Sequence, residues 1–212
     1  MHNSLDNLLS IQSEINNKKI NVIAVSKTFT INHILPLINH GHSHFGENKV
    51  QEAIEKWTDI KKDIPNIKLH LLGKLQTNKV KFVLPLFDYL HSLDNLKLAK
   101  KISEEQKKKN FKPKIFIQIN VGMESQKNGI NEEDVENFYE TCKNNLDLNI
   151  IGLMCIPPFD KDPEPYFKKI QLLSERLSLK ELSMGMSNDY IKAIKNGSTY
   201  IRVGSKIFGS RD

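Results

Sequence analysis

The sequence contains little cysteine, with two in 212 residues, and it has no long apolar run. Cys142 and Cys155 form no CxxC or Cys/His spacing, which argues against a disulfide framework or a zinc site, so both are expected to be reduced packing residues. No stretch approaches the ~18 apolar residues of a membrane span, and the polar segment 1–13 lacks the basic-then-apolar order of a signal peptide. We therefore expect a cytoplasmic protein that does not associate with membranes.

Positive charge is in modest excess, because the chain has 31 basic and 25 acidic residues and a formal net charge of +6. Such an excess suits either nucleic acid or a phosphorylated small molecule, since both are anionic. Much of it is lysine on helix-like segments such as 97–109, which is typical of a solvated helix face. The sequence has no recognised nucleic-acid motif and no aromatic stacking platform, so no nucleic-acid partner is expected.

Short β-branched or apolar runs alternate along the chain with longer segments of helical periodicity, which is the pattern of a parallel sheet. Strands are predicted near 20–25, 43–46, 68–72, 87–91, 114–120, 149–154, 181–184 and 200–203. Helices are predicted near 5–15, 31–40, 47–58, 76–84, 94–109, 131–144, 164–178 and 188–196. Eight strand–helix units predict a single domain, 1–212, folded as a compact (β/α)8 TIM-type barrel, with a doubly wound open sheet as the alternative.

Polar and glycine residues at the segment ends predict several helix boundaries. Ser92 or Asp94 is expected to cap the helix at 94–109, and Asn131 is expected to cap the helix at 131–144. Gly197 is expected to end the helix at 188–196. These signals support the same alternation.

Lys27 is a candidate for covalent chemistry because it directly follows a run that should be buried, Val22 to Val25. In a barrel, functional side chains collect where the strands end. Desolvation at the rim of an apolar barrel would lower the pKa of a lysine, and a neutral amine can form an imine. A lysine at a strand end is more often simply solvated, so this residue needs support from its surroundings.

Two glycine–serine turns follow the last two predicted strands. Gly185 permits a tight turn before Ser187, which can cap the next helix and bind an anion there. Arg202 is followed by Gly204 and Ser205, where glycine lets an anion approach the backbone amides. Either turn alone could be ordinary loop geometry. Together, after the last two strands of a barrel, they predict a phosphate site.

Several motifs match one known family over nearly the whole chain. They are Ala24-Val-Ser-Lys27, Phe45-Gly-Glu-Asn48, Val50-Gln-Glu52, His70 to Lys79, Ile117-Gln-Ile-Asn120, Gly152-Leu-Met154, Leu182 to Ser187, Arg202-Val-Gly204 and Ile207 to Asp212. In these segments the chain resembles the pyridoxal 5'-phosphate (PLP) homeostasis protein family, whose fold is similar to the N-terminal barrel of alanine racemase.

The resemblance implies that the cofactor is PLP, bound covalently as a Schiff base on Lys27. It further implies the roles of five other residues: Ser187, Gly204 and Ser205 would hold the phosphate, Arg202 would face the pyridine nitrogen, and Asn48 would lie beside the ring. Ser205 stands where the family usually has threonine, and it keeps the hydroxyl. The family also favours a monomer.

The expected function is reversible PLP binding in vitamin B6 homeostasis, without a committed catalytic reaction. An arginine opposite the pyridine nitrogen disfavours its protonation, so carbanion stabilisation should be weak. An incoming amine, including a lysine of a PLP-dependent apoenzyme, could take the cofactor from Lys27 by transimination. We expect PLP and such apoenzymes to be the partners.

The alternative function is weak PLP-dependent amino-acid racemisation, which needs a second acid or base. No motif places a tyrosine at the strand ends, so structural packing is expected for Tyr89, Tyr139, Tyr166, Tyr190 and Tyr200. His70 and His91 are expected to be hydrogen-bonded structural histidines rather than catalytic groups. Lys127 matches a family segment and could offer a second amine, although an ordinary surface lysine is the more common case.

Overall fold

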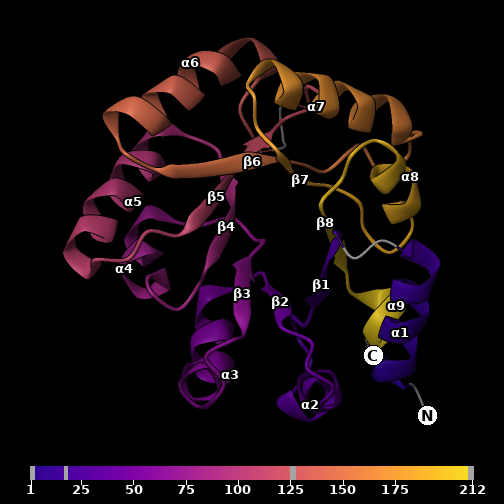
Figure 1. The fold of residues 1–212 in the computed structure, drawn as a ribbon. Coiled ribbons are helices and arrows are strands. Elements are labelled where there is room, and N and C mark those ends of the chain that lie inside the picture. The colour runs from indigo at the N-terminus through magenta and orange to yellow at the C-terminus, as the bar shows by residue number, and fades with distance from the viewer. Residues whose placement is uncertain (1–2, 17–18, 125–127, 210–212) are drawn as a thin grey trace.

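The computed structural model describes residues 3–16, 19–124 and 128–209, and its centre is a closed barrel of eight parallel strands in chain order (Figure 1). The strands are β1 (Asn21–Val25), β2 (His44–Glu47), β3 (Lys68–Leu71), β4 (Tyr89–Leu93), β5 (Lys114–Ile119), β6 (Asn149–Cys155), β7 (Glu181–Ser183) and β8 (Tyr200–Val203). The first strand pairs with the last, with Asn21 opposite Tyr200. The predicted (β/α)8 barrel is confirmed, and the open sheet is excluded.

Helices surround the barrel as an outer ring (Figure 1). They are α1 (Ser4–Ile15), α2 (Ile31–Asn39), α3 (Val50–Asp63), η1 (Thr77–Lys79), α4 (Val80–Val83), α5 (Leu96–Lys109), η2 (Glu132–Asp134), α6 (Val135–Glu140), η3 (Thr141–Asn145), α7 (Glu164–Arg176), α8 (Tyr190–Lys195) and α9 (Ser205–Phe208). The short α9 packs against α1, so the first and last helices lie side by side.

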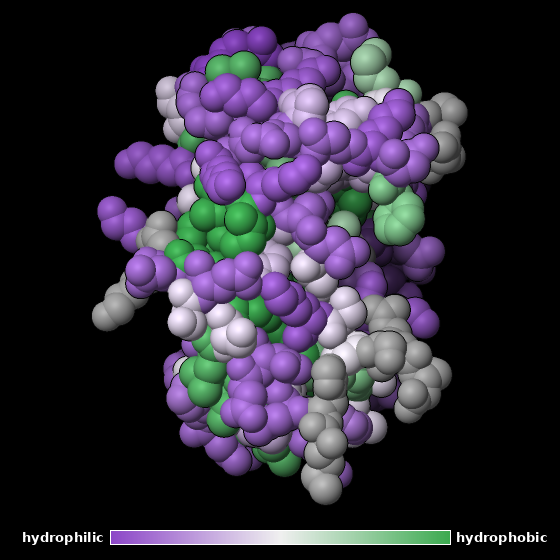
Figure 2. All heavy atoms as spheres, turned by 90° about the vertical axis from the view of Figure 1, so that its right-hand side faces the viewer, coloured by the Kyte–Doolittle hydropathy of each residue, from purple (hydrophilic) through white to green (hydrophobic). Residues whose placement is uncertain are grey.

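The apolar core has two layers. The larger layer lies between the sheet and the helices, and includes Trp57 and Phe167. The smaller layer fills the barrel interior with Ile23, Phe116, Met154 and two tyrosines. Helices that cover the outer layer keep their polar side toward solvent, and the face on the right of Figure 1 is largely hydrophilic (Figure 2). In α5 the lysines at 97, 100 and 107–109 are exposed while Leu98 and Ile102 are buried, which confirms the predicted solvated face.

The predicted packing roles are confirmed for the cysteines and for most of the tyrosines. Cys142 and Cys155 are free and buried, and burial raises the pKa of each thiol to about 12. The buried tyrosines are Tyr89, Tyr139, Tyr190 and Tyr200, and Tyr166 packs against the core while partly exposed. Within the part of the chain that the structure describes, no helix is long and apolar enough to cross a membrane.

The helix caps correct the prediction for α5 and agree in position with the prediction for Asn131. The cap of α5 is Asn95, whose side chain accepts from the Leu98 N–H at 2.9 Å. Ser92 instead donates to the Gly73 carbonyl, and Asp94 accepts from the Asn95 side chain. Asn131 stands at the N-cap of η2 without a side-chain cap bond, because there a 3-10 turn begins the helical segment.

Of three other predicted boundaries, one agrees with the structure and two differ, because the residue belongs to the neighbouring element. Gly197 directly follows Asn196, the C-cap residue of α8, and has a φ of +87°. It ends the helix as predicted. Phe87 was predicted to start a strand, but its N–H donates to the Val83 carbonyl and closes the preceding helical turn. Glu47 was predicted to start a helix, but it belongs to β2 and α3 begins at Val50.

Candidate functional site

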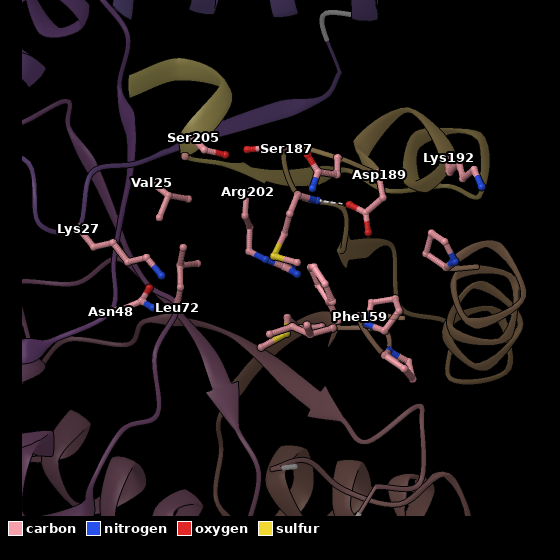
Figure 3. Close-up of a pocket in the computed structure, with 18 of the residues that line it drawn as sticks. Val25, Lys27, Asn48, Leu72, Phe159, Ser187, Asp189, Lys192, Arg202 and Ser205 are labelled. Atoms are coloured by element: carbon pink, nitrogen blue, oxygen red, sulfur yellow. Dashed lines mark hydrogen bonds between the residues drawn. The ribbon is translucent and has the colours of Figure 1, made fainter. Parts of the chain in front are cut away.

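A cavity of about 860 Å³ opens at the carboxyl ends of the strands, and we call it the carboxyl-end cavity. Its wall is built by the ends of β1, β2, β6, β7 and β8 and the turns that follow them. All six residues predicted for the cofactor line it: Lys27, Asn48, Ser187, Arg202, Gly204 and Ser205. Residues that are up to 178 positions apart in the sequence are therefore gathered around one space (Figure 3).

Lys27 stands on a tight turn directly after β1. The Phe29 N–H donates to the Ser26 carbonyl at 3.2 Å, and Thr28 has a left-handed φ of +71°. That backbone is held from outside, because the Thr28 N–H donates to the Glu52 carboxylate of α3 at 2.5 Å. The half-buried Lys27 side chain extends into the cavity, and Asn48 lies near its amine end (Figure 3).

Glu47 anchors this turn from beneath, and the sequence analysis missed its role. The carboxylate is fully buried, and its Oε1 accepts from the Ser26 hydroxyl at 2.8 Å, from Lys56 Nζ at 2.9 Å and from Trp57 Nε1 at 2.9 Å. Lys56 also donates to the Ser26 carbonyl at 2.9 Å. One carboxylate thus ties the ends of β1 and β2 to α3. An acidic residue between a buried strand and Asn48 was the available signal.

Asn48 is positioned by a close backbone contact with the turn after β3. A Cβ built on Gly73 would lie 2.1 Å from the Asn48 carbonyl oxygen, so no side chain fits there. The Gly73 carbonyl is itself bonded by the Ser92 hydroxyl at 2.7 Å. Glycine at this position therefore lets two strand ends approach each other and sets the backbone from which Asn48 projects.

Arg202 forms the floor of the cavity and is only 6% exposed. Its Nη1 donates to the Ser183 carbonyl at 2.5 Å and to the Ser183 hydroxyl at 2.7 Å, and its Nη2 donates to the Cys155 carbonyl at 2.9 Å. Burial lowers the pKa of Arg202, but an arginine stays cationic at neutral pH. Guanidinium has five N–H groups, so these three bonds leave two for a group in the cavity.

Two turns on the opposite wall present hydroxyl groups. Gly185 has a φ of +91°, and a Cβ there would lie 2.6 Å from the Ala193 Cβ, so the turn after β7 requires glycine. The Lys206 N–H donates to the Ser187 hydroxyl oxygen at 3.3 Å, which links the turn after β7 to the turn after β8. Ser187 and Ser205 lie close together on this wall (Figure 3).

The outer wall is a proline-rich loop between β6 and α7, from residue 156 to residue 163, and it is largely apolar. Phe159 lines the cavity and is 99% exposed, while Ile156 is partly exposed. The same part of the wall carries Lys161 and Lys192, and Lys192 pairs with Asp162 at 2.8 Å.

Other predicted candidates lie elsewhere or are not described. His70 and His91 are fully buried inside the barrel and hydrogen-bonded, which confirms their structural assignment. Lys127 lies outside the described residues. None of the described residues that line the cavity is a tyrosine.

Comparison with known proteins identifies the family. Residues 2–212 match the family model of the alanine racemase N-terminal domain. The pyridoxal phosphate homeostasis protein of Aquifex aeolicus is 37% identical over 199 residues, which cover 90% of this chain and 86% of the relative. The human protein of the same name is 38% identical over 213 residues, covering 90% of this chain and 76% of the relative. The chain belongs to the pyridoxal phosphate homeostasis protein family.

Solved structures agree with membership of the pyridoxal phosphate homeostasis protein family. PipY of Synechococcus elongatus PCC7942, solved without PLP, has a TM-score of 0.90 at 33% identity, with 96% of this chain and 99% of that chain covered. PipY solved with PLP bound has a TM-score of 0.90 at 32% identity, covering 97% and 100%. Alanine racemase of Clostridium difficile 630, at 17% identity and a TM-score of 0.78, shares the fold over 99% of this chain and 57% of its own. The family predicted from the motifs is therefore confirmed.

Proposed function

We propose that this chain binds PLP reversibly in the carboxyl-end cavity, in a Schiff base with Lys27, and serves PLP homeostasis as a carrier. The observation that carries the proposal is the convergence of one lysine amine, one fixed guanidinium and two hydroxyl-bearing turns on a single cavity. These groups match three of the polar parts of PLP, which are the aldehyde, the pyridine nitrogen and the phosphate. The PLP-bound structure of PipY, at 32% identity over 97% of this chain, supports the same cofactor.

In this proposal the groups that line the cavity bind different parts of PLP. The amine of Lys27 adds to the aldehyde, a water molecule leaves, and the carbon–nitrogen double bond holds the cofactor. Ser187 and Ser205 donate hydroxyl hydrogen bonds to the phosphate, and Gly204 keeps its backbone open to it. Asn48 lies beside the ring. An incoming amine can replace Lys27 on the same carbon, which returns the lysine to its free form and releases the cofactor without net reaction.

Arg202 favours storage over catalysis in this arrangement. PLP acts as an electron sink when its pyridine nitrogen is protonated, and a fixed cation opposite that nitrogen disfavours the proton. A racemase also needs acids or bases on both faces of the substrate carbon. We infer that the chain works as a monomer and passes PLP to PLP-dependent apoenzymes.

Borohydride reduction of the PLP-loaded protein followed by peptide mapping tests the attachment. We expect a single pyridoxyl label on Lys27 and no label in Lys27→Ala. Lys161→Ala is the matched control, because Lys161 lines the same cavity and should leave the labelling of Lys27 intact. A label on Lys161 or on another lysine in the wild-type protein would refute the proposed attachment.

Deuterium incorporation tests the carrier role separately. The loaded protein is incubated in heavy water with L-alanine and with D-alanine, and the Cα position is analysed by NMR. A carrier exchanges the amino acid at the carbon–nitrogen bond and leaves Cα–H in place. Catalytic uptake of deuterium, abolished by Lys27→Ala, would establish the racemase alternative instead.

A further inference from the structure

A chain of hydrogen-bonded side chains crosses the barrel interior and ends on Arg202. His44 Nδ1 lies 2.9 Å from His70 Nε2, and His70 Nδ1 lies 2.9 Å from His91 Nε2. His91 Nδ1 lies 2.9 Å from the Ser183 hydroxyl, which accepts from Arg202 Nη1 at 2.7 Å. We call these four residues, His44, His70, His91 and Ser183, the histidine chain. They come from β2, β3, β4 and β7, so the chain passes through the middle of the barrel.

The histidine chain is neutral at physiological pH. His70, His91 and Ser183 are fully buried. Burial holds the pKa of His70 and His91 well below the usual range, and the positive charge of Arg202 lowers that of His91 further. Burial also lowers the pKa of His44 to about 4. Each imidazole therefore carries one ring proton, donates through one nitrogen and accepts through the other.

Arg202 sets the direction of the hydrogen bonds. Guanidinium can only donate, so the Ser183 oxygen accepts from it. The hydroxyl hydrogen of Ser183 then needs an acceptor, and among the described residues its remaining partner is His91 Nδ1. His91 must carry its proton on Nε2 and donate to His70, which in turn donates from Nε2 to His44. The reverse order would leave a buried hydroxyl hydrogen unpaired, at a cost of about 1–3 kcal/mol.

Ring stacking holds the same histidines in place. The His70 ring stacks on Tyr89 with centroids 4.2 Å apart and an interplanar angle of 13°. The His91 ring stacks on Phe116 at 4.4 Å and 25°. Both aromatic partners belong to the interior layer of the core. Stacking therefore restricts the rotation of both rings. It also fixes the position of His91 Nδ1 relative to the Ser183 hydroxyl.

We propose that Ser183, His91 and His70 are positioning residues for Arg202. By committing the Ser183 proton to His91, the histidine chain leaves a Ser183 lone pair aimed at Nη1, and this fixes the plane of the guanidinium beneath the cavity. The guanidinium, which lines the cavity, is then held in one orientation. This inference rests on the proposed function, in which that orientation meets the pyridine nitrogen of PLP.

The direction of the hydrogen bonds can be tested on the cofactor-free protein. Nitrogen-15 NMR of histidine-labelled protein should show His70 and His91 neutral and protonated on Nε2 across neutral and mildly acidic pH. Protonation of either ring on Nδ1 in the wild-type protein would overturn the proposal. Because this measurement needs no PLP, it stands or falls independently of the proposed function.

The effect on Arg202 is tested with two buried serines. Ser183→Ala removes the hydroxyl that joins Arg202 to His91. Ser198→Ala is the matched control, because Ser198 is also buried on the β7–β8 side. Among the residues that the structure describes, its hydroxyl bonds only to backbone carbonyls, those of Leu182, Met184 and Tyr200. We expect Ser183→Ala to weaken PLP binding about tenfold, the equivalent of one hydrogen bond to a charged group, and Ser198→Ala to change it less than about twofold.

A spectroscopic measurement separates positioning from general stability. The nitrogen-15 shift of labelled pyridine nitrogen in bound PLP should move in Ser183→Ala and stay at the wild-type value in Ser198→Ala. Equal affinities and equal pyridine shifts in the two variants would overturn the positioning role. Failure of wild-type protein to retain PLP on Lys27 would instead refute the proposed function, while the tautomer result would remain valid.

Discussion

The barrel has a cavity at each end, and the two differ in charge. The carboxyl-end cavity, of about 860 Å³, is lined by Lys27 and Arg202 among other groups. A second cavity of about 450 Å³ lies at the amino ends of β1 and β2 and is lined by His42 and His44 together with amide and apolar side chains. Burial lowers the pKa of both histidines to about 4, so the two histidines that line this cavity are neutral near pH 7.

This difference explains why an anionic ligand is expected at the carboxyl end of the barrel rather than at the amino end. Both cavities are lined in part by residues of β1 or of the segments next to β1 and β2. Fixed cations occur at the carboxyl end, where strand ends and turns supply hydrogen bonds to hold them, as Ser183 and Cys155 do for Arg202. At the amino end, desolvation keeps the imidazoles neutral. An anionic ligand therefore has a charged partner at the carboxyl end.

The largest expected effect follows from removing the charge of Glu47 beneath the Lys27 turn. Glu47→Gln should destabilise the protein by about 3 kcal/mol, because Lys56 is left largely buried with less compensation. Urea unfolding measures the change. Glu52→Gln is the control, since that carboxylate also pairs with Lys56 but is more exposed, and about 1 kcal/mol is expected. Equal losses in the two variants would show that Glu47 is not the anchor.

Low pH should reduce the free energy of unfolding, because the histidines of the second cavity and of the histidine chain are neutral in the folded protein. The folded-state pKa values of His42, His44, His70 and His91 all lie below 6.5, so the unfolded chain binds more protons as the pH falls. Stability should be full above pH 6.5 and decline toward about pH 4, with a loss on the order of 2 kcal/mol for each neutral histidine by about pH 5.

Urea titrations at several pH values measure this decline. His42→Asn should make it shallower, because one buried proton acceptor is removed. His40→Asn, an exposed neighbour on the same segment, should leave the slope unchanged. A wild-type stability that is flat between pH 6.5 and about pH 4 would contradict the assignment of neutral histidines.

The serine turns should contribute a smaller, ligand-specific effect. Ser187→Ala and Ser205→Ala should each weaken PLP binding by about 1 kcal/mol, which corresponds to roughly fivefold. Pyridoxal, which lacks the phosphate, serves as the internal control, and its affinity should not change. Absorbance titration measures both ligands. If pyridoxal and PLP lose affinity equally, the serines do not bind the phosphate.

The smallest effect on stability is expected at the apolar loop. Phe159 is almost fully exposed, so Phe159→Ala should change the free energy of unfolding by less than about 0.5 kcal/mol. Because Phe159 lines the cavity, the same change should speed PLP dissociation about twofold to threefold by removing apolar contact. Phe82→Ala, at an exposed phenylalanine of α4, should not alter that rate.

The sequence predicted the strands, their order and the six lining residues because these features follow from local pattern and from motifs. It missed Glu47 as an anchor, because the donors that converge on it come from two other segments, the turn after β1 and α3, which only the fold brings together. The histidine chain was missed for the same reason, since four strands supply its members. Asn95 rather than Ser92 caps α5, because the Ser92 hydroxyl donates instead to the Gly73 carbonyl.

The seam between β1 and β8 has a consequence for biosynthesis. Lys27 follows β1 on one side of this seam and Ser205 follows β8 on the other, so the ribosome supplies the proposed amine 178 residues before the last proposed phosphate ligand. A nascent chain that ends before β8 carries Lys27 and Ser187 but lacks Arg202, Gly204 and Ser205. Under the proposed function, a chain that terminates before β8 is therefore expected to lose most of its PLP binding, although seven of the eight strands have been translated.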